Sequence, residues 1–232
     1  MQNDSQLAVQ GSFDNIFSTG KTAELLESAK PFLELMMQNE CALREVETKL
    51  NVLNDEFSTM YNYNPIETIK TRVKDPISIV EKMKRKGIPP TIENIEATLN
   101  DIAGVRVICS FPEDIYAIAD ILTMQDDITL ISRKDYIANP KPNGYRSLHL
   151  IIGIPIFLST GKKIMRAEVQ FRTIAMDFWA ALEHKLKYKH NIRNTEEISA
   201  RLKECADAIT ELDEKMQSIH NQIERENREE SF

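Results

Sequence analysis

The segment KIMRAEVQFRT at residues 163–173 places polar side chains at every second position: Arg166, Glu168, Gln170 and Arg172. Alternate residues of a β-strand point to the same face, so these four predict one polar face, opposite an apolar face formed by the residues between them. Glu168 is the residue of chemical interest, since Mg²⁺ in phosphoryl-type transfer is held by one or two carboxylates together with phosphate oxygens and water. A plain solvated strand face is the alternative interpretation.

A second carboxylate, Asp101, stands just before another predicted strand, residues 105–111, within the run NDIAGVRVICSF. Asp101 and Glu168, entering from two strands, could hold one Mg²⁺ between them. Arg106 alternates with Val105 and Val107, so it points away from the aliphatic row of its strand. An arginine on an edge strand and an aspartate that caps a turn are the alternative interpretation.

A cluster of cations is found in residues 71–87, TRVKDPISIVEKMKRKG. Asp75 as N-cap, Pro76 at the first helical position and Gly87 as a stop predict a short helix. One hydroxyl group and four cations lie on one face of this helix or just ahead of it: Arg72, Lys74, Ser78, Lys82 and Arg85. That combination suits a polyphosphate, although most charge runs are simply solvated helix faces.

Turn residues and aromatic chemistry meet in RKDYIANPKPNGYRSLHL, residues 133–150. The run PKPNGY predicts a turn between strands, after which Tyr145, Ser147 and His149 alternate onto one face. A basic loop that ends in an aromatic residue can stack on a base and hold its phosphates. An ordinary Asn-Gly hairpin with a surface tyrosine is the alternative, and His149 taken alone is more often structural than catalytic.

Periodicity predicts the elements that must position these residues. Four β-branched runs predict strands at 105–111, 128–137, 147–156 and 164–171, and helical spacing predicts helices at 112–122 and 173–188. Apolar stripes with steps of three and four predict long helices near both ends, over 32–57 and 198–223. The predicted fold class is therefore α/β (α+β), a mixed sheet packed by helices.

Length and charge limit the function classes. In 232 residues, 42% of them hydrophobic, we expect a flexible leader at 1–20, one catalytic domain at 21–190 and an oligomer-forming helix at 191–232. The net charge of −7 argues against stable, sequence-independent DNA binding. Three separated cysteines indicate neither a disulfide framework nor a zinc site. With no apolar run of membrane-helix length, we expect a soluble, cytoplasmic protein.

Taken together and in this order, the four segments resemble the synthetase domain of the RelA/SpoT homologue family, in particular its short members, the small alarmone synthetases. The resemblance covers about residues 60–190 and rests on RVKxxxS, DIAGVRVIC, PKPNGYRSLH, AEVQFRT and FWAALEH. It implies a nucleotidyltransferase-like sheet and Mg²⁺, with ATP donating pyrophosphate to the 3′-hydroxyl of GDP or GTP. The product would be the alarmone ppGpp or pppGpp. The resemblance also implies a homo-oligomer, a tetramer.

The resemblance implies roles on the donor side. Arg72 and Arg106 would sandwich the adenine, because planar guanidinium groups stack on π faces. Four residues would hold the ATP phosphates: Lys74, Ser78, Lys82 and Arg85. Asp101 and Glu168 would bind the Mg²⁺.

On the acceptor side, the resemblance implies that Glu168 takes the proton from the 3′-hydroxyl, with Gln170 beside it as a positioning group. Tyr145 would stack on the guanine. Three further residues would contact the acceptor nucleotide: Lys134, Lys141 and His149.

Some features depart from the family pattern. The long members add a hydrolase domain with a His-Asp signature, and none of the four histidines here precedes an aspartate, so we expect synthesis without degradation. Some short members of the family are activated by their own product and carry an aromatic residue at the position of Thr68. Asp177 replaces a neutral amide that is common there. Self-activation and the choice between GDP and GTP therefore stay open.

Two other functions are alternatives. Relatives that resemble these synthetases pyrophosphorylate the 3′ end of tRNA as toxins, but that role would need a basic surface for the tRNA body, which the acidic composition disfavours. The other alternative is a catalytically idle regulator that binds nucleotides or RNA. Retention of both Asp101 and Glu168 argues against it.

Overall fold

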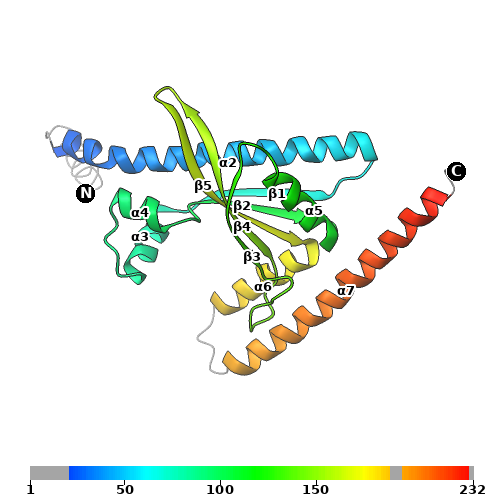
Figure 1. The fold of residues 1–232 in the computed structure, drawn as a ribbon. Helices are drawn as coiled ribbons and strands as arrows, with labels where there is room; N and C mark the ends of the chain where they lie inside the picture. Colours follow the sequence, from blue (N-terminus) through cyan, green and yellow to red (C-terminus); the bar gives the residue numbers. More distant parts are fainter. Residues whose placement is uncertain (1–20, 189–194, 230–232) are drawn as a thin grey trace, which may run out of the picture.

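The computed structural model describes residues 21–188 and 195–229, and its centre is a five-stranded mixed sheet (Figure 1). The strands are β1 (Ile66–Val73), β2 (Ala103–Cys109), β3 (Thr129–Asp135), β4 (Leu148–Leu158) and β5 (Gly161–Thr173). Their order across the sheet is β1-β2-β5-β4-β3. The pair β2–β5 is parallel and the other three pairs are antiparallel. The predicted α+β class with a mixed sheet is confirmed.

Helices precede the sheet, connect some of its strands and follow it along the chain. In the described ranges they are α2 (Lys21–Tyr61), α3 (Pro76–Arg85), α4 (Ile92–Thr98), α5 (Pro112–Thr123), α6 (Ile174–Tyr188) and α7 (Thr195–Glu229). The long helix α2 runs across the sheet and contacts β1, β2, β4 and β5 (Figure 1). The long helices predicted near both ends are confirmed. The predicted leader at 1–20 lies outside the described residues.

Burial follows the predicted alternation in the two central strands. Val105 and Val107 of β2, and Val169 and Phe171 of β5, are almost completely buried. They share one hydrophobic core with residues of α2 and α5, and each such side chain stabilises the fold by roughly 1.5–3 kcal/mol relative to exposure. The residues between them lie on the opposite, polar face of the sheet. One face of the sheet therefore forms the hydrophobic core, and the other face carries the polar residues that could bind a ligand.

Helix α3 begins and ends as the sequence predicts. The side chain of Asp75 accepts a hydrogen bond of 2.9 Å from the backbone N–H of Ser78, and Pro76 is the first helical residue. Gly87 follows the helix with a φ of +69°, in the left-handed region that favours glycine. A small second core fastens α3 and α4 to α2 through Leu35, Ile79, Met83, Ile95 and Leu99.

Two elements are absent from the sequence prediction. Strand β1 is an edge strand whose exposed positions outnumber its buried ones, so it lacks the apolar alternation that marks β2 and β5. Helix α4 has seven residues, too few for a clear helical period. Arg72, predicted just ahead of α3, therefore lies within β1, where it pairs with Gly104.

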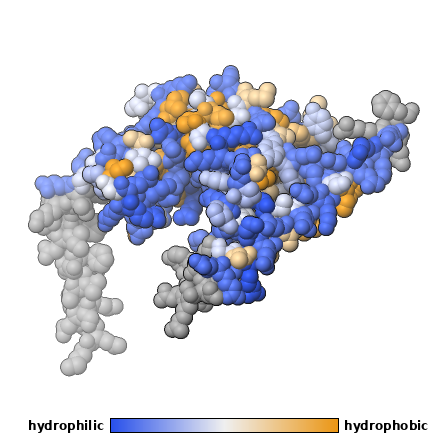
Figure 2. All heavy atoms as spheres, turned by 60° about the horizontal axis from the view of Figure 1, so that its bottom comes forward, coloured by the Kyte–Doolittle hydropathy of each residue, from blue (hydrophilic) through white to orange (hydrophobic). Residues whose placement is uncertain are grey.

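Helix α7 packs through a different face from the apolar stripe that predicts it. Its buried residues include Ala206 and Asp213, and the hydroxyl of Thr173 donates a hydrogen bond of 2.6 Å to Asp213. The stripe instead stays about half exposed, at Leu212, Met216, Ile219 and Ile223. Figure 2 shows a mostly hydrophilic surface with separate hydrophobic patches, one of them on α7 near its C-terminal end.

We predict that Gly144→Ala destabilises the fold more than Gly87→Ala. Both glycines have positive φ, which costs an L-residue about 1–2 kcal/mol. A Cβ on Gly87 meets open space, whereas one on Gly144 would lie 2.6 Å from the Cβ of Ala206 in α7. We expect this clash to add roughly 1–3 kcal/mol, measured by urea denaturation.

The double variant Gly144→Ala with Ala206→Gly, compared with Ala206→Gly alone, is the matched control, because it removes the clashing methyl group, keeps the backbone strain and accounts for the cost of a glycine inside α7. Equal destabilisation by the two single variants would contradict the packing of this turn against α7.

Candidate active site

One row of residues crosses the polar face of the sheet from edge to edge. Lys70 of β1 pairs with Arg106 of β2, which pairs with Gln170 of β5. Gln170 pairs in turn with His149 of β4, and His149 with Lys134 of β3. Residues separated by up to a hundred positions in sequence are thus aligned by strand register.

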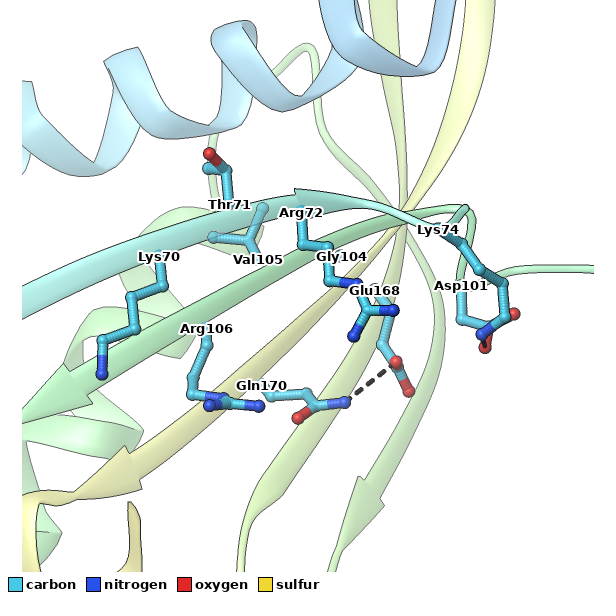
Figure 3. Close-up of a pocket in the computed structure, with 10 residues that line it drawn as sticks. All are labelled: Lys70, Thr71, Arg72, Lys74, Asp101, Gly104, Val105, Arg106, Glu168 and Gln170. Atoms are coloured by element: carbon cyan, nitrogen blue, oxygen red, sulfur yellow. Dashed lines mark hydrogen bonds and ion pairs between the residues drawn. The ribbon is translucent and has the colours of Figure 1, made fainter. Parts of the chain in front are cut away.

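A cavity of about 400 Å³ opens at the β1 end of this row (Figure 3). In Figure 3 the side chains of Arg106, Glu168 and Gln170 point to the same side of the sheet, while Thr71 points to the other. Gly104 lies between Arg72 and Glu168 in the register and leaves that position without a side chain. The charged and amide residues that line the cavity are Lys70, Arg72, Lys74, Asp101, Arg106, Glu168 and Gln170.

A second cavity, of about 210 Å³, opens at the β3 end of the sheet. It is lined by Ser132, Lys134, Tyr136, Lys141, His149, Ile151 and Glu168. Glu168 lines both cavities and so stands at the boundary between them. The structure therefore offers two adjoining spaces for ligands that meet at one carboxylate.

Asp101 is held by two lysines. The ammonium groups of Lys74 and Lys82 each donate a hydrogen bond of 2.7 Å to Oδ2. Burial acts to raise the pKa of Asp101, but these hydrogen bonds and charges outweigh it, so the pKa is lowered and the carboxylate stays ionised. Oδ1 is buried and has no hydrogen-bond partner among the described residues.

Glu168 accepts two hydrogen bonds, one on each oxygen. The Nδ1 atom of His149 lies 3.2 Å from Oε1, and the Nε2 atom of Gln170 donates to Oε2 at 3.0 Å. Burial acts to raise the pKa of Glu168, and the charge of Asp101 adds to this, but the contacts with His149 and Gln170 lower it overall. Glu168 is therefore ionised at neutral pH.

The residues at this point suit a divalent metal of the Mg²⁺ type. Asp101 and Glu168 line one cavity and sense each other's charge, and Oδ1 of Asp101 lacks a partner. Within residues 21–188 and 195–229, no group of three or more His, Cys, Asp or Glu side chains is placed to bind a metal. Two carboxylates are nevertheless the set that Mg²⁺ uses when substrate phosphates and water complete its shell.

Some predicted phosphate ligands lie outside both cavities. The hydroxyl of Ser78 donates a hydrogen bond of 2.5 Å to Asp75, within the cap of α3. Lys82 reaches the first cavity only through Asp101, which it contacts directly. Arg85 lies in the last turn of α3 and lines neither cavity. Lys134, Lys141 and His149 line the second cavity together, as their common assignment requires.

Tyr145 lies beneath Lys141 instead of lining the second cavity. The ammonium of Lys141 is 4.8 Å from the ring centre of Tyr145 and 4.7 Å from that of Tyr136. Tyr136 contributes directly to the cavity, and the sequence prediction omits it. The sequence could have pointed to Tyr136, because it is an aromatic residue in the same basic segment, three residues after Arg133.

Asp177, in the first turn of α6, contacts three cations of the candidate site. Its carboxylate, with 14% of the side chain exposed, lies 3.0 Å from Arg172, 3.3 Å from Arg106 and 3.4 Å from Lys70. Asp177, one of the two departures from the family pattern, thus places a negative charge among three cations. Thr68, the other departure, lies in edge strand β1 and pairs with Ile108.

A bare sheet face that gathers cations around two carboxylates defines a protein built to bind phosphate-rich ligands. The chain belongs to the RelA/SpoT family: the family described as "Region found in RelA / SpoT proteins" matches residues 71–193. It is 46% identical over 183 residues to GTP pyrophosphokinase YwaC of Bacillus subtilis, which covers 79% of this chain and 87% of that protein.

Two solved structures from Bacillus subtilis resemble the fold closely. Small alarmone synthetase 2 matches with a TM-score of 0.74 and 44% identity over 82% of this chain and 98% of that one. Small alarmone synthetase 1 bound to its product pppGpp matches with a TM-score of 0.75 and 36% identity over 84% and 99%. The family resemblance read from the motifs is confirmed.

Membrane-spanning helices are not found in the part of the chain that the structure describes, since each described helix is too short or too polar to cross a bilayer.

Proposed function

We propose that this protein transfers the pyrophosphate of ATP to the 3′-hydroxyl of GDP or GTP and so makes ppGpp or pppGpp. The observation that carries the proposal is the pair of cavities that meet at Glu168. Three of the residues assigned to ATP line one of them: Arg72, Lys74 and Arg106. Three of those assigned to the acceptor line the other: Lys134, Lys141 and His149. A group passing between two bound nucleotides needs this arrangement, because the reacting atoms must come within about 3–3.5 Å.

The donor nucleotide would enter the larger cavity. Arg72 and Arg106 lie on neighbouring strands with Gly104 as the partner of Arg72, so a planar base has room between the two guanidinium groups. The phosphates would then extend toward Lys74, just before α3, and toward Asp101, which Lys74 contacts. Lys82, Ser78 and Arg85 would meet the outer phosphates along the face of that helix.

Asp101 and Glu168 would hold the Mg²⁺. Bound there, the ion would supply positive charge to offset the negative charge that develops on the transferring group. Lys74 and Lys82 keep Asp101 ionised and oriented for this task. Their positive charge also faces the phosphates, so one cluster serves both ligands.

The acceptor would enter the smaller cavity. Stacking of its guanine on Tyr145 requires Lys141 to leave the ring, after which Lys141 and Lys134 can pair with the nucleotide's phosphates. Glu168, ionised and placed between the cavities, accepts the proton from the 3′-hydroxyl. Gln170 keeps one oxygen of that carboxylate engaged.

One experiment separates this proposal from its alternatives. Purified protein is incubated with Mg²⁺, ATP labelled in its β- and γ-phosphates, and GDP, GTP or tRNA. We expect label on the guanine nucleotides alone, and no loss of added pppGpp, because synthesis without degradation is proposed. Label on tRNA alone would favour the toxin activity, and no transfer at all would favour the idle regulator.

We further propose that the exposed stripe of α7 joins copies of the chain into a homo-oligomer, a tetramer. About half of each side chain at Leu212, Met216, Ile219 and Ile223 faces solvent while α7 packs through Ala206 and Asp213. Contiguous apolar residues on one helix face are typical of an interface.

Light scattering at micromolar concentration should therefore give a mass several times that of one chain. The variant Met216→Glu with Ile223→Glu should reduce it without unfolding the domain, because neither side chain packs in the core. A wild-type protein that is monomeric under these conditions would contradict the proposal.

We predict that Asp101→Asn and Glu168→Gln each reduce turnover on the order of 100-fold or more, the scale of lost electrostatic preorganisation. Each change removes a charge that would hold Mg²⁺ and keeps the size of the side chain. Product formation is followed by nucleotide chromatography over a range of Mg²⁺ concentrations. Asp120→Asn, which removes an exposed carboxylate paired with Arg133, is the control. Near-normal turnover in either site variant would overturn the metal assignment.

We predict opposite binding defects for Tyr145→Ala and Arg106→Ala. Loss of stacking in Tyr145→Ala should weaken GDP or GTP by roughly 1–3 kcal/mol and leave ATP nearly unchanged. Arg106→Ala should weaken ATP and spare the acceptor. Calorimetric titration with Mg²⁺ and a non-transferable ATP analogue measures each nucleotide separately.

Tyr61→Ala, an exposed tyrosine at the end of α2, should affect neither titration. If Tyr145→Ala weakened ATP and spared the guanine nucleotide, the assignment of the two cavities would be wrong.

A further inference from the structure

Glu168, which lines both cavities, belongs to a closed ring of hydrogen bonds with four other side chains: Gln170, Arg172, Tyr145 and His149. One arm runs from Arg172 Nη2 to Tyr145 Oη at 2.8 Å, from Tyr145 Oη to His149 Nε2 at 2.8 Å, and from His149 Nδ1 to Glu168 Oε1 at 3.2 Å. The other runs from Arg172 Nη2 to Gln170 Oε1 at 3.0 Å and from Gln170 Nε2 to Glu168 Oε2 at 3.0 Å. Both arms begin at Arg172 and end at Glu168.

We propose that Arg172 is a positioning residue that acts through this ring, fixing the orientation of the Glu168 carboxylate and the tautomer of His149. This proposal rests on the proposed function, in which Glu168 takes the proton of the acceptor hydroxyl. Arg172 touches neither cavity, so it acts through other residues rather than on the substrate.

The direction of every hydrogen bond in the ring follows from its two ends. A guanidinium only donates and an ionised carboxylate only accepts. Because the ionised Glu168 can only accept, a neutral His149 carries its hydrogen on Nδ1 and donates it to Glu168. Nε2 of His149 is then an acceptor, so the hydroxyl of Tyr145 donates to it while its oxygen accepts from Arg172.

The second arm is set in the same way. Arg172 donates to the carbonyl oxygen of Gln170, and this fixes which end of the amide faces Glu168. The amide nitrogen then donates to the second carboxylate oxygen. Rotation of the Glu168 carboxylate would break hydrogen bonds on both oxygens at once.

Arg172 is itself firmly anchored. Only 6% of its side chain is exposed, and its Nη1 atom donates a hydrogen bond of 3.0 Å to Asp177. Asp177 lies in the first turn of α6, where the helix dipole favours a negative charge. A buried cation needs such a partner. Asp177 also lies 3.3 Å from Arg106, which lines the first cavity, so one carboxylate contacts both Arg172 and a residue of that cavity.

Tyr145→Phe tests the ring with the least disturbance, because it keeps the aromatic face and removes only the hydroxyl link. We expect kcat to fall by about 10–100-fold, the usual cost of losing a supporting hydrogen bond, while the KM for GDP or GTP stays within about twofold. Tyr63→Phe removes a hydroxyl that donates to Asp114, away from both cavities, and should change neither constant.

The tautomer of His149 gives a readout that does not depend on activity. ¹⁵N spectra of the imidazole, assigned with His149→Gln, should show the Nδ1–H form in the wild type and a mixture with Nε2–H in Tyr145→Phe. Arg172→Lys should give the same mixture, since one ammonium cannot replace contacts with Asp177, Tyr145 and Gln170 together.

The outcomes distinguish the ring from the activity. An unchanged kcat in Tyr145→Phe, or an Nε2–H tautomer in the wild type, would overturn the positioning role even if the protein makes ppGpp. If the protein made no ppGpp, the proposed function would fail on its own, and a wild-type Nε2–H form in the spectra would still overturn the ring.

Discussion

The alternation of apolar and polar side chains along β2 and β5 is the constraint on which the site depends. These two strands are the parallel pair of the sheet, and their apolar faces are buried beneath α2 and α5. Because side chains alternate with a period of two, Arg106, Glu168 and Gln170 must then emerge together on the other face. A shift of one residue in the register would bury these charges and expose the valines, so the core itself protects the alignment of the site.

The charges on that face are partly compensated by two carboxylates. Asp101 pairs with Lys74 and Lys82, and Asp177 pairs with Arg106 and Arg172, so positive charge remains in excess. This pairing limits the repulsion among cations that would otherwise face one another across adjacent strands. Under the proposed function, the phosphates of a nucleotide would bind by replacing these carboxylates as partners of the cations.

The sequence predicts those parts of the fold in which one physical pattern dominates. The core faces of β2 and β5 and the cap of α3 follow from period and capping chemistry. The common assignment of Lys134, Lys141 and His149, which line one cavity, came instead from the family resemblance. Edge strand β1 is missing from the sequence prediction because an exposed strand needs no apolar alternation. The sequence prediction placed Arg172 correctly on the polar face of β5. Its proposed positioning role depends on its ion pair with Asp177, which α6 brings close to the sheet. Such tertiary contacts leave no local pattern in the sequence.

Helix α7 connects the acceptor side of the site to the outer surface of the molecule. Its inner face touches the loop that carries Tyr145, since Arg146 donates a hydrogen bond of 3.3 Å to the carbonyl oxygen of Ala206 and lies 3.4 Å from Asp207. The outer face carries the exposed apolar stripe. Because a helix is rigid over this length, a partner that displaced the stripe would also displace the turn at Gly144, which packs against Ala206, and with it the neighbouring Tyr145. Under the proposed assembly and the proposed acceptor site, oligomer formation and acceptor binding would therefore be coupled through α7.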